Sequence, residues 1–240
     1  MMRKSEGSAS CPRNRSAMNQ GETVIDIKDL DFSYPYGKKV FEGLNFSLKR
    51  GETVGLTGAN GAGKTTLFHL IMGLLKPDAG EISIFGKARK AERDFMEVRR
   101  RVGLVFQDSD DQLFCPTVEE DIAFGPLNLG KSQEEAKAIV REVCERLGLK
   151  GFERKVTHRL SGGEKRLVAL ATVAAMNPEC FLLDEPVAGL DEATTDRFLR
   201  YLKEYGKTYV IITNDREFLK NAVDKVYMLK DSEIISWSKL

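Results

Sequence analysis

The chain has 240 residues, of which 37 are Lys or Arg and 36 are Asp or Glu, so its formal net charge is +1. So balanced a charge predicts neither a nucleic-acid partner nor direct attraction to a charged membrane surface. The longest nearly unbroken apolar run, Leu167 to Met176, is far shorter than the roughly 20 residues that cross a bilayer, so we expect any membrane association to come through a partner.

Residues 1–21 are polar and mildly basic, and they lack the apolar stretch of a secretion signal. We expect a disordered tail, or a segment upstream of the true start, since Met18 can serve equally well as the first residue. From residue 22 onward, strand-like and helical stretches alternate, which is typical of an α/β sheet with crossover helices. The predicted strands are 23–30, 44–48, 53–57, 81–85, 102–106, 180–184, 208–213 and 226–229, and helices are predicted after Lys64, Asp191 and Asp215.

Between residues 108 and 176 this alternation is interrupted by helical patterns. Ser132 and Glu135 have the spacing of a capping box at the start of a helix. One face of that helix would carry Ala136, Val140, Val143 and Leu147. The sequence therefore predicts a helical subdomain at 108–176, inserted into an α/β core formed by 22–107 and 177–240.

The segment from Gly58 to Thr65 fits the phosphate-binding pattern G-x-x-x-x-G-K-[S/T] and lies between a predicted strand and a predicted helix. Glycines let successive N–H groups turn inward, and the helix N-terminus adds partial positive charge. Lys64 can then reach the β- and γ-phosphates, while the Thr65 hydroxyl can bind Mg²⁺. A glycine-rich turn in an unrelated protein is the alternative, but strand, loop, lysine, hydroxyl and helix are all in register. The residues predicted to hold a nucleoside triphosphate are Gly58, Asn60, Gly61, Ala62, Gly63, Lys64, Thr65 and Thr66.

The predicted strand at 180–184 ends in two adjacent acids, Asp184 and Glu185. A carboxylate at a strand end beside a phosphate loop can hold Mg²⁺, which suits Asp184. The next residue can orient or deprotonate a water for attack on the γ-phosphate, which suits Glu185.

Ser161, Gly162 and Gly163 precede a predicted apolar helix at 167–176. Exposed N–H groups and a hydroxyl at a helix N-terminus form a second anion-binding site, although the segment read alone could be a plain helix cap and turn. Because a helical subdomain separates the two anion sites of this chain, we expect two chains to share each nucleotide.

Together these motifs resemble ABC-type ATPases in kind and in order, over about residues 22–235. The matching segments are Gly58–Thr65, Gln107, Leu160–Glu164, Cys180–Pro186, Gly189–Asp191 and the strand ending at Thr213. The resemblance implies an α/β P-loop ATPase core with a mixed sheet, flanking helices and an antiparallel β subdomain, and an inserted helical signature subdomain. It also implies ATP and Mg²⁺ as ligands, with Thr65, Gln107 and Asp184 at the metal.

The same resemblance implies a head-to-tail dimer, in which each ATP lies between the phosphate loop of one chain and the signature of the other. Catalytic roles would fall to Glu185, Asn214 and Gln107, and Asp191 would bridge the two chains. Tyr34 is placed like the aromatic residue that stacks on adenine, with Tyr36 as the alternative. The residues that would contact the partner's ATP are Ser161, Gly162, Gly163 and Glu164.

Residues 102–130 resemble a narrower group, the energy-coupling-factor importer ATPases, through the segments Gln-Asp-x-x-Asp-Gln-Leu-Phe and Ala-Phe-Gly-Pro-x-Asn-Leu-Gly. That resemblance implies uptake of cobalt, nickel or a vitamin, powered from the cytoplasmic face of the cell membrane. The implied partners are a second ATPase subunit, an integral membrane coupling subunit and a substrate-binding membrane subunit. An importer ATPase of another branch is the alternative. The end of the chain soon after Trp237 favours a dedicated metal system over a shared vitamin module.

The chain departs from the family at the switch position, where Asn214 replaces the usual His. An amide can donate a hydrogen bond to a phosphate oxygen, but charge-assisted bonds are roughly twice as strong, so we expect weaker hydrolysis at this chain's own site. A partner ATPase that carries the His would compensate, which favours a heterodimer over a homodimer. In the signature, Glu164 replaces the usual Gln and Leu167 stands where Arg is common.

Two other functions stay open at this stage. A regulatory module that binds nucleotide with negligible hydrolysis would also explain Asn214. A soluble ABC-type protein acting on DNA or ribosomes would need a long coiled-coil insertion or tandem cassettes, and this chain has neither pattern. Copurification of integral membrane proteins is expected only for an importer ATPase.

Overall fold

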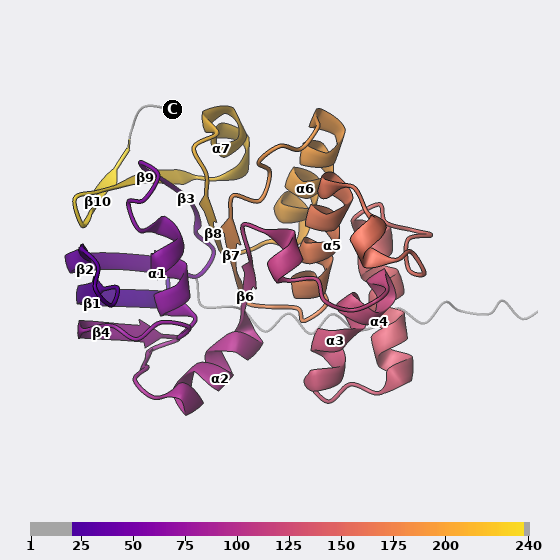
Figure 1. Cartoon of the computed structure of the whole chain (residues 1–240), viewed down its shortest axis with the longest axis horizontal. Coiled ribbons are helices and arrows are strands. Elements are labelled where there is room, and N and C mark those ends of the chain that lie inside the picture. Colours follow the sequence, from indigo (N-terminus) through magenta and orange to yellow (C-terminus); the bar gives the residue numbers. More distant parts are fainter. Residues whose placement is uncertain (1–20, 238–240) are drawn as a thin grey trace, which may run out of the picture.

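The computed structural model describes residues 21–237, so almost all of the predicted tail lies outside the described residues. Two sheets and their flanking helices make up this part of the chain (Figure 1). The four-stranded sheet has the order β2-β1-β4-β5, and all of its pairs are antiparallel. Its strands are β1 (Thr23–Ser33), β2 (Lys39–Lys49), β4 (Ala79–Ile84) and β5 (Lys87–Ala88).

The six-stranded sheet has the order β10-β9-β3-β8-β7-β6. Neighbouring strands in it are parallel, apart from the antiparallel pair β10–β9. Its strands are β3 (Thr53–Thr57), β6 (Val102–Val105), β7 (Cys180–Asp184), β8 (Tyr209–Ile212), β9 (Lys225–Lys230) and β10 (Glu233–Ser236). Because parallel strands share one carboxyl edge, the segments that follow β3, β6, β7 and β8 meet there, where ligands of such sheets bind.

Helices cover both faces of the six-stranded sheet. In β8, Val210 and Ile212 pack with the four-stranded sheet and α1, whereas Tyr209 and Ile211 pack with the helices on the opposite face. This alternation explains the continuous apolar runs of the parallel strands, which are buried on both sides. The helices are α1 (Lys64–Ile71), α2 (Glu92–Arg101), α3 (Val118–Asn128), α4 (Gln133–Arg146), α5 (Gly162–Ala174), α6 (Glu192–Tyr205) and α7 (Arg216–Ala222), with short 3₁₀ turns η1 (Ser109–Asp111) and η2 (Thr157–Arg159).

Helices α3, α4 and α5 lie together at one side of the molecule (Figure 1). The predicted capping box of α4 is confirmed, because Ser132 Oγ accepts from the Glu135 N–H at 3.2 Å while the Glu135 carboxylate accepts from the Ser132 N–H at 2.8 Å. The predicted apolar face is buried, at Ala136, Val140, Val143 and Leu147. The division into a core and a subdomain at 108–176 remains a prediction.

The structure corrects several predicted elements. The patterns missed β5, β10 and α2, and α2 escaped notice because Phe95 and Val98 are its only buried residues in a charged segment. The helix predicted after Lys64 is short and ends at Ile71, since Gly73 just beyond it adopts a φ of 66°. Helix α5 begins at Gly162, before the predicted apolar stretch. Within residues 21–237, no helix combines the length and the apolar character needed to cross a bilayer.

Candidate nucleotide site

A cavity of about 450 Å³ opens at the carboxyl edge of the parallel strands. The phosphate loop, the end of β1, the segment after β6 and the end of β7 all contribute to its wall. Its lining residues are Tyr34, Val40, Asn60, Gly61, Gly63, Lys64, Thr65, Thr66, Gln107, Asp184, Glu185 and Ile212. Most of the predicted site therefore comes together within one chain. The predicted residues outside this lining are Gly58 and Ala62 of the phosphate loop, Ser161–Glu164 and Asn214.

Two glycines give the phosphate loop its shape. Gly58 has a φ of 151°, and a Cβ there would lie 2.5 Å from the carbonyl oxygen of Leu229. Gly63 has a φ of 98°, and a Cβ there would lie 2.7 Å from Val40 Cγ1. Both positions combine a backbone conformation that side chains disfavour with a lack of space, so the loop requires glycine at each.

Lys64 lies over the phosphate loop. Its ammonium group donates to the carbonyl oxygens of Gly58, at 2.8 Å, and Ala59, at 3.1 Å. As the first residue of α1, Lys64 stands at the positive end of a helix that begins inside the loop. A triphosphate in the loop would meet both the lysine charge and this helix N-terminus.

The residues predicted to hold Mg²⁺ fit a divalent cation. Asp184 Oδ1 is buried and has no hydrogen-bond partner among the described residues. Burial raises the pKa of Asp184, and a hydrogen bond from Thr65 opposes that shift. A buried, unpartnered carboxylate oxygen needs a compensating partner, and hard oxygen ligands of this kind suit Mg²⁺. Gln107 lines the same cavity and can add an amide oxygen.

Glu185 follows β7 in a strained conformation that turns its side chain into the cavity. Its φ is 43°, a left-handed value that non-glycine residues seldom adopt. Its N–H donates to the Ile212 carbonyl oxygen at 2.9 Å, which ties the turn to β8. Burial raises the pKa of Glu185, while a hydrogen bond with Thr213 opposes the shift. A carboxylate whose pKa lies closer to neutral is a better general base at physiological pH.

Asn214 lies beside the phosphate loop and contacts its first residues. The side-chain oxygen of Asn214 accepts from the Thr57 hydroxyl at 2.8 Å and from the Gly58 N–H at 3.3 Å. Because two donors already engage the oxygen, the NH₂ group remains as the group that Asn214 can offer to a phosphate.

Tyr34 lines the cavity, and its hydroxyl is 3.1 Å from Thr66 Oγ1 in a hydrogen bond. Tyr34 is 41% exposed, and its ring packs edge-on against Phe32. Tyr36, the alternative, is fully exposed and does not line the cavity. The geometry is therefore compatible with adenine stacking at Tyr34, which remains a prediction.

The second anion site lies at the N-terminus of α5. Ser161 Oγ accepts from the Glu164 N–H at 3.3 Å, and the Glu164 carboxylate accepts from the Ser161 N–H at 2.7 Å. Glu164 also pairs with Lys155 at 3.1 Å, which offsets the negative charge at a position where Gln is usual. Ser161 and Gly162 are exposed. Asp191 caps α6 by accepting from the Thr194 N–H at 2.8 Å.

Comparison with known proteins agrees with this geometry. Residues 41–188 match the family described as ABC transporter. The chain belongs to the ABC transporter family. It is 47% identical to an energy-coupling factor transporter ATP-binding protein EcfA of Methanocaldococcus jannaschii, over 88% of this chain and 77% of that protein. A second EcfA, from Methanothermobacter thermautotrophicus, is 45% identical over 89% of this chain and 70% of its own length.

Solved structures of ABC ATPases have the same fold. The structure of cbiO1 from Clostridium perfringens, described as part of the ABC transporter complex cbiONQ, matches with a TM-score of 0.79 and 35% identity over 89% of this chain and 87% of its own. The dimeric ATP-binding cassette MJ0796 bound to ADP and Pi also matches with a TM-score of 0.79, at 29% identity over 88% of this chain and 96% of its own. The chain is thus an ABC-type ATPase, of the energy-coupling-factor kind, and the α/β fold predicted from the sequence is confirmed.

The structure adds four residues that the sequence analysis missed: Val40 and Ile212 line the cavity, and Thr57 and Arg166 contact the predicted site residues. Thr57 holds Asn214. Arg166 of α5 donates to the carbonyl oxygens of Gln107 and Glu185. The sequence did contain an indication of Arg166, because this arginine directly precedes Leu167, the position at which ABC ATPases commonly carry Arg.

Proposed function

We propose that the chain is the ATP-hydrolysing subunit of an energy-coupling-factor importer that takes up cobalt, nickel or a vitamin. It acts at the cytoplasmic face of the cell membrane, on which it is held by membrane-embedded partners. ATP is bound with Mg²⁺ by the phosphate loop, Thr65, Gln107 and Asp184, and Glu185 activates the attacking water. The names of the two EcfA relatives and of the cbiO1 structure support the importer.

One observation carries this proposal. A single chain gathers the phosphate loop, Asp184 and Glu185 in one cavity, while the N-terminus of α5 with Ser161 stays outside it and exposed. An exposed helix N-terminus with a serine and two glycines is suited to a phosphate from another molecule. Two chains arranged head-to-tail would bring the two sites together at one nucleotide, and two similar cassette structures, each described as dimeric, support an assembly of two chains.

The test uses a variant that binds ATP without hydrolysing it. We expect Glu185→Gln, mixed with the second ATPase of the same membranes, Mg²⁺ and ATP, to form a stable dimer, measured by light scattering after gel filtration. Adding Lys64→Ala abolishes nucleotide binding and the dimer together. Adding Ser161→Arg instead abolishes the dimer while ATP binding to the single chain persists. A dimer that survives Ser161→Arg contradicts the shared nucleotide.

Asn214 supports a heterodimer. An uncharged switch residue weakens this chain's own site, and a second ATPase with a histidine there supplies the stronger one. In that case Glu185→Gln dimerises poorly alone and readily with the second ATPase from the same membranes. A chain that hydrolyses ATP briskly alone, as a homodimer, contradicts this part of the proposal.

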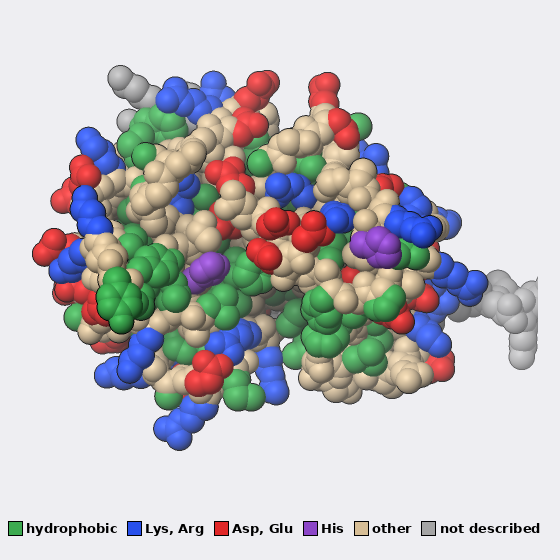
Figure 2. Space-filling view, in the orientation of Figure 1, with side chains coloured by type: hydrophobic (Ala, Val, Ile, Leu, Met, Phe, Trp, Pro, Cys, Tyr) green, Lys and Arg blue, Asp and Glu red, His purple; other side chains and the backbone are tan. Residues whose placement is uncertain are grey.

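The membrane coupling subunit contacts the surface around α3. Figure 2 shows hydrophobic side chains gathered over α3. Phe114 is 67% exposed and packs edge-on against Phe124, with ring centroids 4.9 Å apart. Exposed large apolar side chains in one patch indicate a protein contact. Since Phe114 lies seven residues after Gln107, a partner at this patch acts on the loop that reaches the Mg²⁺ site.

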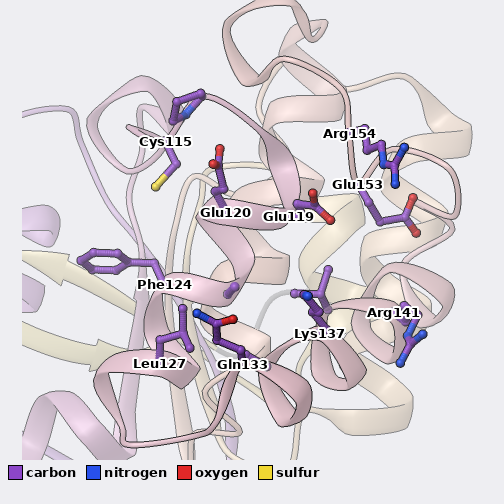
Figure 3. Close-up of a pocket in the computed structure, with 14 residues that line it drawn as sticks. Cys115, Glu119, Glu120, Phe124, Leu127, Gln133, Lys137, Arg141, Glu153 and Arg154 are labelled. Atoms are coloured by element: carbon purple, nitrogen blue, oxygen red, sulfur yellow. The ribbon is translucent and has the colours of Figure 1, made fainter.

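The adjoining hollow, of about 760 Å³, lies between α3 and α4 (Figure 3). Phe124, Leu127 and Val140 form part of its apolar wall, and charged side chains such as Glu119 and Arg141 surround it. We expect Phe114→Ser to lose the integral membrane proteins that copurify with the native chain, with ATP hydrolysis retained. Full copurification of the membrane proteins with Phe114→Ser contradicts this contact surface.

Gln107→Ala is expected to uncouple hydrolysis from transport while the affinity for ATP stays largely unchanged.

A second candidate function rests on Asn214 alone. The chain would then bind nucleotide as a regulatory subunit, with negligible hydrolysis at its own site. Turnover by the assembled complex separates the two functions. Glu185→Gln in this chain lowers the turnover of the complex if the site is catalytic, and leaves it unchanged if the site only regulates.

A further inference from the structure

The proposal concerns Arg166, which lies on the same helix as the signature residues. Helix α5 begins at Gly162, with Ser161 as its cap, so Arg166 follows the serine by little more than one helical turn. A displacement of the α5 N-terminus therefore moves the base of the Arg166 side chain with it.

Arg166 connects α5 to two segments of the catalytic site. Its Nη1 donates to the carbonyl oxygen of Gln107 at 3.1 Å and to that of Glu185 at 2.9 Å. These two acceptors belong to the loop after β6 and to the turn after β7, which are distant in the sequence. A single guanidinium nitrogen thus holds together the backbones of two residues whose side chains line the nucleotide cavity.

The Glu185 backbone needs such support. Its φ of 43° is unfavourable for a residue with a side chain, and such conformations persist only where the surroundings hold them. The Ile212 carbonyl oxygen accepts from the N–H of Glu185. The carbonyl oxygen of Glu185 accepts from Arg166 at 2.9 Å and from the Ala188 N–H at a longer 3.3 Å. The direction in which the carboxylate points is therefore set from both sides of the residue.

We propose that Arg166 is a positioning residue that links the signature helix to the catalytic glutamate of the same chain. The next step rests on the shared nucleotide proposed above. When Ser161 engages the ATP held by the partner, the movement of α5 reaches Glu185 and Gln107 through Arg166, so that each site senses occupation of the other. Arg166 occupies no part of the cavity lining and contributes to turnover without contacting ATP.

The first test measures kinetics and local exchange. We expect Arg166→Met to lower kcat about tenfold while KM for ATP changes less than twofold. Hydrogen–deuterium exchange of the nucleotide-free chain should rise at residues 106–109 and 185–188, with little change elsewhere. Arg166→Lys keeps the charge on a side chain of shorter reach and should recover part of kcat. Arg200→Met, which removes an exposed arginine of α6, is the matched control and should change neither quantity.

The second test concerns the link to the signature. Ser161→Ala should lower kcat, and adding Arg166→Met should lower it by much less than tenfold further, because both changes interrupt one path. The proposal is overturned if the losses in kcat from Ser161→Ala and Arg166→Met are fully additive. It is also overturned if Arg166→Met changes neither kcat nor hydrogen–deuterium exchange. If Ser161→Ala leaves kcat unchanged and no dimer forms, both the shared nucleotide and the transmission from α5 to Glu185 are contradicted. The kinetics and exchange of Arg166→Met then decide separately whether Arg166 holds Glu185.

Discussion

The hydroxyl of Thr57 donates a 2.8 Å hydrogen bond to the side-chain oxygen of Asn214, although 157 positions separate the two residues. Thr57 ends β3 and Asn214 follows β8, and these strands are parallel neighbours in the six-stranded sheet. The last residue before the phosphate loop therefore orients the residue at the switch position. Two predictions follow from this contact.

The first prediction changes the switch residue itself. We expect Asn214→His to raise kcat about tenfold, or roughly 1.4 kcal/mol, because a protonated histidine adds its own positive charge to a hydrogen bond whose phosphate acceptor is already charged. Steady-state ATPase rates of the purified chain and of the assembled complex provide the measurement. Brisk hydrolysis by the native chain, with no gain from the histidine, would show that Asn214 is not a weakened switch.

The second prediction removes the hydroxyl that holds Asn214. Thr57→Val keeps the shape of the side chain and should lower kcat about threefold to tenfold, the loss of about one hydrogen bond. In an Asn214→Ala background the same change should have little further effect, which a double-mutant cycle measures. Thr53→Val is the control, because Thr53 bonds Asp224 at the opposite end of β3. An equal loss of kcat from Thr57→Val in the native chain and in the Asn214→Ala variant would contradict a role for this contact.

A third prediction compares two glycines of the phosphate loop. In Gly58→Ala the new Cβ would lie 2.5 Å from the Leu229 carbonyl oxygen, a backbone atom that cannot move aside. We expect the free energy of unfolding to fall by about 2–4 kcal/mol, with a loss of ATP binding. Gly61→Ala meets no neighbouring atom, so its φ of 79° alone should lower the same free energy by about 1 kcal/mol. Urea denaturation provides both values, and equal effects would contradict the steric explanation.

A fourth prediction concerns pH and the residue just before β7. The Glu179 carboxylate accepts from Arg101 at 2.6 Å and from Arg50 at 2.9 Å. The Arg101 hydrogen bond is the main reason that the pKa of Glu179 lies below its usual value, with burial opposing it and Arg50 assisting. The pKa is lower in the folded state, so this stabilisation is complete above the unfolded-state pKa of about 4.3 and disappears as the pH falls through the folded-state pKa.

The matching variant is Glu179→Gln. We expect it to lower the free energy of unfolding by about 1–2 kcal/mol at pH 7, and the difference from the native chain should shrink below about pH 4. Thermal and urea unfolding across that pH range provide the comparison. Glu145→Gln, on the exposed face of α4, should leave stability nearly unchanged at every pH. A constant difference at all pH values would show that the carboxylate charge is not the stabilising feature.

Much of the nucleotide site could be predicted from the sequence because its residues are consecutive. The phosphate loop from Gly58 to Thr65 and the adjacent acids Asp184 and Glu185 each occupy a single turn, so local pattern and chemistry coincide. The strands β3 and β7 that carry them were predicted with the bounds that the structure has. Helix α2 and strands β5 and β10 were missed because they are short or polar, and tertiary packing rather than periodicity stabilises them.

The sequence by itself therefore determined the family and the ligand class, and it predicted the groups that would contact phosphate. Only the tertiary structure decided how these groups are held. Thr57 reaches Asn214 because β3 pairs with β8, and Arg166 reaches Glu185 because α5 packs beside β6, the neighbour of β7 in the sheet. Such contacts join segments far apart in the chain, and their hydrogen bonds depend on the order in which strands pair, which no local pattern of residues encodes.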